Sequence, residues 1–470
     1  MSDIPVHDAK RGWEGKVAFA PGPDGFAYRP REIVVAGDRG RDEAQARFGA
    51  TFNAVPELVF SLEKEQKEAG KEEEEFPVEG DEKPPVPLYR LRVKGDVDPE
   101  RPDLIDPILA AEELRLEGLI VQPNHVLFSH GCECCGPHPA EAWGCGVAGS
   151  PFYAKALSAS PFYAKALSAS PFYAKAVVAS PFYAKDLQAT GKRRSSAIPA
   201  VQPPARPRPA SMARVPRVAV LDTGMAAKNV RPSSLDPFAP ARKHWEIPDV
   251  DRDHELDPAA GHGTFIAGLI DLVIPGCKLR VEKVLSSYGD GDEVCIARRI
   301  HYLAGKVDLI NLSLGGYASS QMHVLAAAVR RATLKGTVVV ASAGNEGTCR
   351  RTYPAALPDV VGVGAVGPDG PAPFTNYGPW VRACAPGVDI VSWFFTEVIG
   401  PRTASAGTPD PDDFASWACW SGTSFAAPLV TAALARYMGT YDVGAAEAVR
   451  NVIDDPHLLR LPDLGTVVNI

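Results

Sequence analysis

VPRVAVLDTGM (residues 215–225) is a short apolar run, rich in β-branched residues, in which the apolar stretch ends on an acid. Runs of this kind are typical of strands buried on both faces of a parallel sheet. Four more follow it, separated by helical stretches such as GTFIAGLIDLVI (263–274). They are KLRVEKVL (278–285), VDLINLSLGG (307–316), GTVVVASAGN (336–345) and DVVGVGAV (359–366). The alternation predicts an α/β fold with a mostly parallel sheet covered by helices on both faces.

Three polar residues in this region have the chemistry of acyl transfer. Asp222 ends the first strand, His262 lies between glycines in GHGTFIAG, and Ser424 opens a helix in SGTSFAAP. A serine hydroxyl needs a base to take its proton, and an acid orients that base and stabilises its charged form. Each residue also has a structural interpretation: Ser424 as an N-cap, His262 as a satisfied histidine at a helix end, Asp222 as a turn residue. Their joint occurrence, in a known triad order, favours a catalytic triad.

Asn345 is a fourth candidate, because it follows a buried strand in VVVASAGNEG. Its side-chain N–H is suited to stabilise an oxyanion, and removing such a donor typically costs about two to three orders of magnitude in turnover. The alternative is a turn residue before a glycine, in the left-handed conformation that Asn tolerates. Asp222, Asn345 and the segment 313–316 all lie where strands are predicted to end, which is where sites form in such sheets.

Residues 215–438 resemble the subtilisin-like serine proteases (subtilases) in both wording and spacing. The resemblance is carried by VLDTG, HGTFIAG, NLSLGG, SAGNEG, YPAALPDVVGVGAV, FTNYG, ACAPG and SGTSFAAP. It implies the subtilase fold and endopeptidase activity through an acyl-enzyme, with Asp222, His262 and Ser424 as the triad and Asn345 in the oxyanion hole. It also implies that Ser313, Leu314, Gly315 and Gly316 pair with an extended substrate strand, and that Ala341, Ser342, Ala343 and Gly344 form a wall of the specificity pocket. Strand addition recognises a backbone whatever its sequence.

Departures from the family pattern bear on packing and on ligands. Phe265 stands where a second histidine is usual and Phe425 where methionine is usual, so both positions keep an apolar side chain. GLIDLVIPGCKLRVEKVL (268–285) lacks the Asn-rich loop through which many relatives bind a structural calcium, and we expect no required cofactor. Arg350 and Arg351 lie near the expected floor of the specificity pocket, where they would favour acidic side chains if they point inward.

A small α+β domain is predicted over residues 28–130, after an N-terminal extension over residues 1–27. REIVVAG (31–37), LYRLRV (88–93) and VQPNHVLFS (121–129) have strand character, and segments with helical spacing lie between them. The domain loosely resembles the inhibitory prodomains of subtilases, which implies docking on the enzyme with its last strand leading into the active site. More than eighty residues separate it from Arg214. A cleaved zymogen segment and a permanent regulatory domain therefore both stay open.

Residues 131–213 are predicted to be a tether that leads to a catalytic domain over residues 214–470. They hold a decapeptide repeat (SPFYAKALSA, SPFYAKALSA, SPFYAKAVVA, SPFYAKDLQA; 150–189) and a basic, Pro-rich linker. We interpret the repeats as a spacer, as peptides released by a protease, or as a docking motif whose number raises its avidity for a partner. Ahead of them lie Cys132, Cys135, His138 and Cys145. A single CxxC pair favours a reduced Cys-rich turn over a zinc site.

The composition limits the classes of function. A net charge of -8 argues against a nucleic-acid groove, and no apolar run approaches membrane-spanning length. The N-terminus shows no signal-peptide h-region, and nine cysteines, an odd number, do not suit a disulfide framework. These features predict a cytoplasmic location, with non-classical export as the alternative.

The sequence therefore predicts a serine endopeptidase that acts on peptide or protein substrates, with its N-terminal domain as an inhibitor in cis. Two alternatives stay open. One is a dedicated peptide-processing protease whose own repeats are substrate, and the other is a scaffold on a protease fold whose repeats recruit partners.

Overall fold

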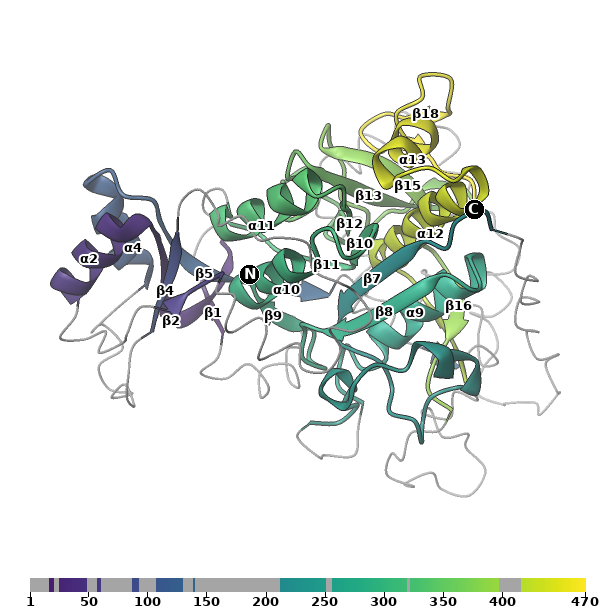
Figure 1. Cartoon of the computed structure of the whole chain (residues 1–470), viewed down its shortest axis with the longest axis horizontal. Helices are drawn as coiled ribbons and strands as arrows, with labels where there is room; N and C mark the ends of the chain where they lie inside the picture. Colours follow the sequence, from purple (N-terminus) through teal and green to yellow (C-terminus); the bar gives the residue numbers. More distant parts are fainter. Residues whose placement is uncertain are drawn as a thin grey trace, which may run out of the picture.

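The computed structural model describes two units, a smaller N-terminal one and a larger C-terminal one (Figure 1). The described residues are 17–20, 25–48, 57–60, 87–92, 107–129, 138–139, 212–250, 256–318, 322–396 and 416–470. The decapeptide repeats and the Pro-rich linker as far as residue 211 lie outside these ranges, so the predictions made for them stay predictions.

A mostly parallel sheet forms the centre of the C-terminal unit. Its strands are β7 (Arg217–Asp222), β8 (Lys278–Lys283), β10 (Leu309–Leu312), β12 (Val338–Ser342), β13 (Val360–Gly367), β15 (Val381–Pro386), β18 (Arg460–Leu461) and β19 (Gly465–Val467). Their spatial order is β8-β7-β10-β12-β13-β15-β19-β18, and every neighbouring pair except the last is parallel. The short β14 (Gly370–Pro371) pairs antiparallel with β13. The predicted α/β fold is confirmed.

Helices cover both faces of this sheet. Successive apolar side chains along each strand point to opposite faces, so each face needs helices to bury it. They are α9 (His262–Val273), α12 (Thr423–Tyr441) and α13 (Ala445–Val452) on one face, and α10 (Glu293–Leu303) and α11 (His323–Leu334) on the other (Figure 1). Along β7, Val218 and Val220 belong to the core with α9 and α12. Ala219 and Leu221 belong to the core with α10 and α11. Burial on both faces explains why these runs are apolar throughout.

The chain order places a site at the end of β7. From β7 the chain passes to β8 on one side of it, and then crosses to β10 on its other side. Such a switch in direction opens a crevice at the carboxyl ends of the strands. Asp222, the last residue of β7, lies at that end.

The N-terminal unit is an antiparallel sheet with helices on one face. Its elements are β1 (Ala18–Phe19), β2 (Ala27–Ala36), α2 (Gly37–Phe48), β3 (Glu57–Leu58), β4 (Leu88–Arg92), α4 (Pro107–Leu116) and β5 (Val121–Ser129). The strand order is β5-β2-β4-β3. Ile33 and Val35 of β2 face a core with α2 and α4, whereas Val34 between them belongs to the core of α10 and α11. The sheet is therefore packed between its own helices and the C-terminal unit (Figure 1).

Two short strands extend past the predicted domain boundaries. β1 pairs with β2, so the small sheet begins inside the predicted extension 1–27. β6 (His138–Pro139) lies inside the predicted tether and pairs with β17 (Trp417–Trp420), whose other partner is β16 (Ile390–Trp393). Each of β1 and β6 is a short strand added to the edge of a sheet, and backbone hydrogen bonds make the pairing. A pattern of side chains therefore does not reveal them.

Candidate active site

Asp222 and His262 meet at the end of β7. His262 Nδ1 lies 2.7 Å from Asp222 Oδ1, and both side chains are fully buried. Asp222 Oδ1 also accepts from the Thr223 N–H at 2.8 Å. Within the described residues, neither His262 Nε2 nor Asp222 Oδ2 has a hydrogen-bond partner. The pair is thus held through one nitrogen of the ring, and the other nitrogen is left to exchange a proton.

The start of α9 fits against the turn that follows Asp222. A Cβ at Gly263 would overlap the carbonyl oxygen of Gly224, so only glycine allows this approach. The Gly263 N–H donates to Thr223 Oγ1 at 2.9 Å. Gly263 therefore serves the close contact that brings the imidazole to the acid, whereas a Cβ at Gly261 would overlap the Phe394 ring.

Ser424 lies in the first turn of α12, and its hydroxyl donates to the Ser313 carbonyl oxygen at 3.1 Å. In return, Ser313 Oγ donates to the Ser424 carbonyl oxygen at 2.7 Å. The His262 ring lies 5.5 Å from the Phe425 ring, measured between centroids, so the imidazole is beside the residue that follows Ser424. A hydrogen bond between Ser424 and His262 is not formed. The structure brings acid and base into contact, and places the serine next to them with its hydroxyl turned to Ser313.

Asn345 lies at the amino end of the same helix. Its Oδ1 accepts from the backbone N–H and from the hydroxyl of Thr423, both at 2.9 Å. These bonds fix the plane of the amide beside Ser424, where the helix dipole also favours negative charge. An oxyanion formed on a substrate at Ser424 would lie close to this amide.

The predicted substrate-binding segment is already paired with a strand of the same chain. In β11 (Leu314–Gly315), Leu314 pairs with Ser129 and Gly315 with Phe128 of β5. On its other edge β5 pairs with β9 (Asp290–Asp292), and all these pairings are antiparallel. The next residue, Gly316, exchanges hydrogen bonds with Tyr353 instead of β5. A Cβ at Gly316 would lie 3.0 Å from the Val126 carbonyl oxygen, so a side chain there would require β5 to shift by a few tenths of an ångström.

The residues predicted to form the pocket wall divide into two groups. Ala341 and Ser342 lie within β12, paired with β13, and are fully buried. Ala343 is also buried, and the Gly344 N–H donates to Thr423 Oγ1 at 3.1 Å, which ties this loop to α12. The structure therefore places Ala343 and Gly344 at the end of the strand, beside the start of α12. Ala341 and Ser342 lie inside the sheet.

Arg350 and Arg351, both predicted near the pocket floor, have different surroundings in the structure. The Arg350 guanidinium lies over the Tyr317 ring, 3.8 Å from its centroid, and donates to the Gly25 carbonyl oxygen of the N-terminal unit at 2.9 Å. Arg351 is exposed. Burial, with the Glu346 carboxylate nearby, raises the pKa of Tyr317.

Sequence reasoning missed the polar side chains that support the candidate residues. Thr431 Oγ1 donates to Asn311 Oδ1 at 3.0 Å, and Asn311 Nδ2 donates to Ser313 Oγ at 3.0 Å, so a buried chain of bonds ends on Ser424. Asn311 had a signal, because a polar residue inside the apolar run VDLINLSLGG is costly to bury unless it is bonded. Glu246 had no signal in the sequence, although it is a buried acid whose side chain bonds to Gly261 and Thr264 at the start of α9.

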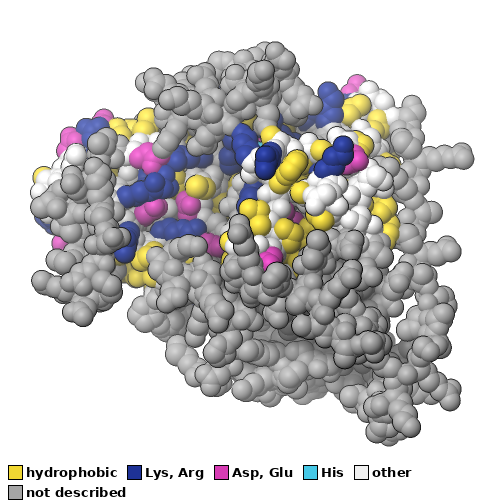
Figure 2. Space-filling view, turned by 90° about the horizontal axis from the view of Figure 1, so that it is seen from below, with side chains coloured by type: hydrophobic (Ala, Val, Ile, Leu, Met, Phe, Trp, Pro, Cys, Tyr) yellow, Lys and Arg dark blue, Asp and Glu magenta, His cyan; other side chains and the backbone are white. Residues whose placement is uncertain are grey.

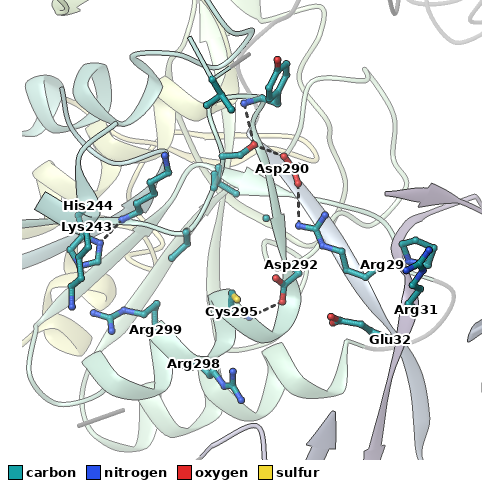
Figure 3. A pocket seen from close by; sticks show the side chains of 18 residues that line it. Arg29, Arg31, Glu32, Lys243, His244, Asp290, Asp292, Cys295, Arg298 and Arg299 are labelled. Atoms are coloured by element: carbon teal, nitrogen blue, oxygen red, sulfur yellow. Dashed lines mark hydrogen bonds and ion pairs between the residues drawn. The ribbon is translucent and has the colours of Figure 1, made fainter. Parts of the chain in front are cut away.

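A cavity of about 960 Å³ lies at the junction of the two units, and its lining mixes charges of both signs (Figure 3). Arg29, from β2, donates to Asp290 at 3.1 Å across the junction. On the side of the C-terminal unit, Arg298 donates to Glu57 at 2.8 Å. Figure 2 shows basic and acidic side chains interspersed toward the N-terminal unit, at the left of the view. Charge pairs thus join the two units beside this cavity.

The predictions about metals and cofactors stay predictions. Among the residues that the structure describes, no group of three or more His, Cys, Asp and Glu side chains is placed to hold a metal ion. Cys132, Cys135 and Cys145 lie outside those residues, and of His138 only the backbone pairing is described. None of the helices in the described ranges is both long and apolar enough to cross a membrane.

The model of the subtilase family matches residues 214–455, which is half of the chain. The chain belongs to the subtilase family. Curated relatives of this subtilase include the thermophilic serine proteinase of Bacillus sp. (strain AK1), 35% identical over 44% of this chain and 50% of the relative. Another is the major intracellular serine protease of Bacillus subtilis (strain 168), 33% identical over 47% of this chain and 67% of the relative.

Among solved structures, this subtilase is similar to a cold-adapted subtilisin-like serine proteinase. The identity is 24% and the TM-score 0.40, over 54% of this chain and 86% of that one. The alignments span about half to three-fifths of the length of the first curated relatives.

Proposed function

We propose that this subtilase is a serine endopeptidase that hydrolyses peptide bonds through an acyl-enzyme on Ser424 and is inhibited in cis by its N-terminal unit. The observation that carries the proposal is the buried 2.7 Å contact between His262 and Asp222, directly beside the start of the helix that holds Ser424. Family membership supports the reaction class, because residues 214–455 match the subtilase family.

The mechanism begins with a rotation of the Ser424 hydroxyl. It leaves the Ser313 carbonyl oxygen, 3.1 Å away, and turns to His262 Nε2, the ring nitrogen without a described partner. His262 then takes the proton as Ser424 attacks the substrate carbonyl, and later gives it to the leaving amine. Asp222 stabilises the imidazolium through Nδ1. Asn345 and the backbone N–H of Ser424 stabilise the oxyanion.

Substrate recognition in this proposal follows strand addition. A substrate would pair with β11 on one side and β9 on the other, and backbone pairing accepts many sequences. Ser313 and Gly316 flank that pairing, and the loop of Ala343 and Gly344 is proposed as the near wall of the specificity pocket. Natural substrates are therefore proposed to be peptides or unfolded protein segments.

Inhibition in cis is supported by the position of β5. Val126, Leu127 and Phe128 pair with β9, and Phe128 and Ser129 pair with β11, so this strand fills the position proposed for substrate. The Ser129 N–H also donates to the Gly289 carbonyl oxygen at 2.9 Å. We propose that the enzyme cuts its own chain a few residues beyond Ser129, and that β5 then remains bound as a product.

Labelling with a fluorophosphonate tests the reaction class. After removal of the N-terminal fragment, the wild-type chain is expected to be labelled and the Ser424→Ala chain is not. Ser421→Ala serves as a matched control, because Ser421 lies in the same segment but bonds to Asp389. Equal labelling of wild type and Ser424→Ala would overturn the assignment.

Mass spectrometry of the same three chains over time tests the inhibition and its alternatives. A cut beyond Ser129 that depends on Ser424, with activity rising as the N-terminal fragment is degraded, supports the proposal. Fragments spaced by ten residues would favour a processing protease that acts on its own repeats. Absence of turnover on unfolded casein after removal of the N-terminal fragment would favour a scaffold.

A further inference from the structure

Glu246 is a buried carboxyl group beside the catalytic pair that the proposed mechanism does not use. The residue is only 3% exposed. Its backbone N–H donates to the Met225 carbonyl oxygen at 2.8 Å, and the Met225 N–H donates to the His244 carbonyl oxygen at 3.1 Å. These bonds attach the segment of Glu246 to the chain just beyond Asp222.

The Glu246 carboxyl group contacts the start of α9. Oε1 accepts from the Gly261 N–H at 2.8 Å, and Oε2 accepts from the Thr264 hydroxyl at 3.2 Å. Gly261 occupies the capping position of this helix and has no side chain to bond the first N–H groups. Thr223 and Glu246, both from outside the helix, take that role. A carboxylate there is also favoured by the helix dipole.

Thr264 completes the link back to the acid. Its Oγ1 accepts from the Ala226 N–H at 2.8 Å, so its own proton is directed at Glu246. The network therefore joins the turn after Asp222 to the first turn of α9, and His262 is the first residue of that helix. A shift of this turn would move the imidazole relative to the acid.

We infer that Glu246 is a positioning residue of the catalytic pair, which through Gly261 and Thr264 holds the first turn of α9 so that His262 Nδ1 faces Asp222. The inference rests on the proposed function, because it assigns a role in the reaction proposed for Ser424. Glu246 lies in the irregular segment between β7 and α9, outside the motifs by which the sequence resembles the family.

The charge of Glu246 adds a second consequence. Burial raises the pKa of this carboxyl to about 7, against the hydrogen bonds from Thr223 and Gly261, and the negative Asp222 acts in the same direction as burial. The other charged group that faces it is Lys283 of β8. His244, on the same segment, stays neutral because burial lowers its pKa to about 4. Ionised Glu246 therefore adds a second buried negative charge to that of Asp222 at the start of α9.

Two substitutions separate the bond from the charge. Glu246→Ala removes both, and kcat per titrated active site is expected to fall by about 10- to 100-fold, with KM changed less than about twofold, because misplacement affects chemistry more than strand binding. Glu246→Gln keeps an acceptor for Gly261 and is expected to recover most of kcat at alkaline pH. Any dependence of kcat on the charge of Glu246, whose pKa burial raises to about 7, is expected to be absent in Glu246→Gln.

The matched control is Glu282→Gln, a fully buried carboxyl of β8 that pairs with Arg280 and Arg299. It is expected to leave kcat per active site and the pH profile unchanged. If Glu246→Ala only lowers the number of titratable sites, as a merely destabilising change does, the inference is wrong. Wild-type kcat in Glu246→Ala would also overturn it.

A measurement on the full-length Ser424→Ala chain does not depend on activity. The Nδ1 proton of His262, shared with Asp222, is followed by NMR in this background. Adding Glu246→Ala is expected to shift or broaden that resonance, and adding Glu282→Gln is expected to leave it in place. An unmoved resonance in Glu246→Ala contradicts the inference. A wild-type chain that stays unlabelled after removal of the N-terminal fragment contradicts the proposed function instead, so the two failures are distinguishable.

Discussion

At the scale of single residues, the proposed catalytic pair and Ser424 are held by different parts of the fold. Asp222 and His262 share one 2.7 Å hydrogen bond between the end of β7 and the start of α9. Ser424 is fixed instead by two bonds to Ser313, on the strand side of α12. The serine can therefore turn its hydroxyl without disturbing the pair.

Asp222→Asn tests the orientation of the base. An asparagine of the same shape can donate to Nδ1, which forces the wrong tautomer on the imidazole, and kcat is expected to fall by about 10⁴-fold with the fold intact. Initial rates on a peptide substrate, normalised to folded protein, measure this. Asp389→Asn is the control, because Asp389 is an exposed acid bonded to Ser421 outside the pair. A loss of tenfold or less in Asp222→Asn would argue against the triad.

The two unusual phenylalanines are expected to be coupled. The rings of Phe265 and Phe425 lie 4.7 Å apart between centroids, and both are fully buried. A double-mutant cycle with Phe265→Leu and Phe425→Met is expected to give a coupling free energy of about 0.5–1.5 kcal/mol, beyond the loss of buried area. Urea unfolding in the Ser424→Ala background, which prevents self-digestion, measures it. Additive effects would mean that the rings only fill space.

At the scale of elements, β5 belongs to two sheets at once. Its first residues pair with β2, for example Val121 with Val35, whereas Leu127 pairs with Gly291 of β9. Between these pairings, buried polar side chains join the units: Gln122 Nε2 donates to Glu293 Oε2 at 2.7 Å, and His125 Nδ1 lies 2.8 Å from the same oxygen. Release of the N-terminal unit must break these bonds together with the backbone pairs.

His125→Ala is expected to loosen β5. Truncating one partner of a buried hydrogen-bonded pair leaves Glu293 short of a donor and costs about 2–5 kcal/mol. Hydrogen exchange of the β5 amides in the Ser424→Ala chain is expected to quicken by about two or more orders of magnitude, while the α12 amides stay protected. Arg92→Ala, which breaks a pair with Glu32 at a 52% exposed side chain, is the control and is expected to change little. Equal exchange in both variants would contradict this role of His125.

Local pattern predicted the elements, but it did not predict which elements pair across the units. β5 occupies residues 121–129 as predicted, because its own composition defines it as a strand. Its partners β9 and β11 lie far along the chain, and nothing in any of the three segments fixes their register. Asp222 and His262 were predicted because each lies in a recognisable motif. Glu246 was not, because its importance comes only from burial against the start of α9.

At the scale of the whole molecule, one apolar core runs through both units. Val34, Phe60 and Leu127 of the N-terminal unit share a core with the residues of α10 and α11. Contact of this kind resembles the interior of one domain more than a transient interface. We therefore expect docking and folding of the two units to be coupled before any cut.

His301 of α10 lies in that shared core, stacked on the Phe60 ring at 4.5 Å between centroids. Burial, with Arg331 and Lys306 nearby, lowers the pKa of His301 to about 3. The unfolded chain binds this proton below about pH 6.5, whereas the folded chain binds it only near pH 3, so the free energy of unfolding falls as pH drops between these values and levels off below. Over the whole interval the loss has a ceiling of the order of 5 kcal/mol.

Substituting His301 is therefore expected to flatten the pH dependence of stability. His301→Phe keeps the stack on Phe60 and removes the titrating ring, so its midpoint of thermal unfolding should fall less than that of the parent between pH 6.5 and pH 4. Both are measured in the Ser424→Ala chain. His457→Phe, at an exposed position, is the control and should follow the parent. A residual slope in His301→Phe is expected from His244, whose pKa burial also lowers, to about 4. Parallel curves for the parent and His301→Phe would show that the ring is not buried against Phe60 in solution, and that the two units do not share this core.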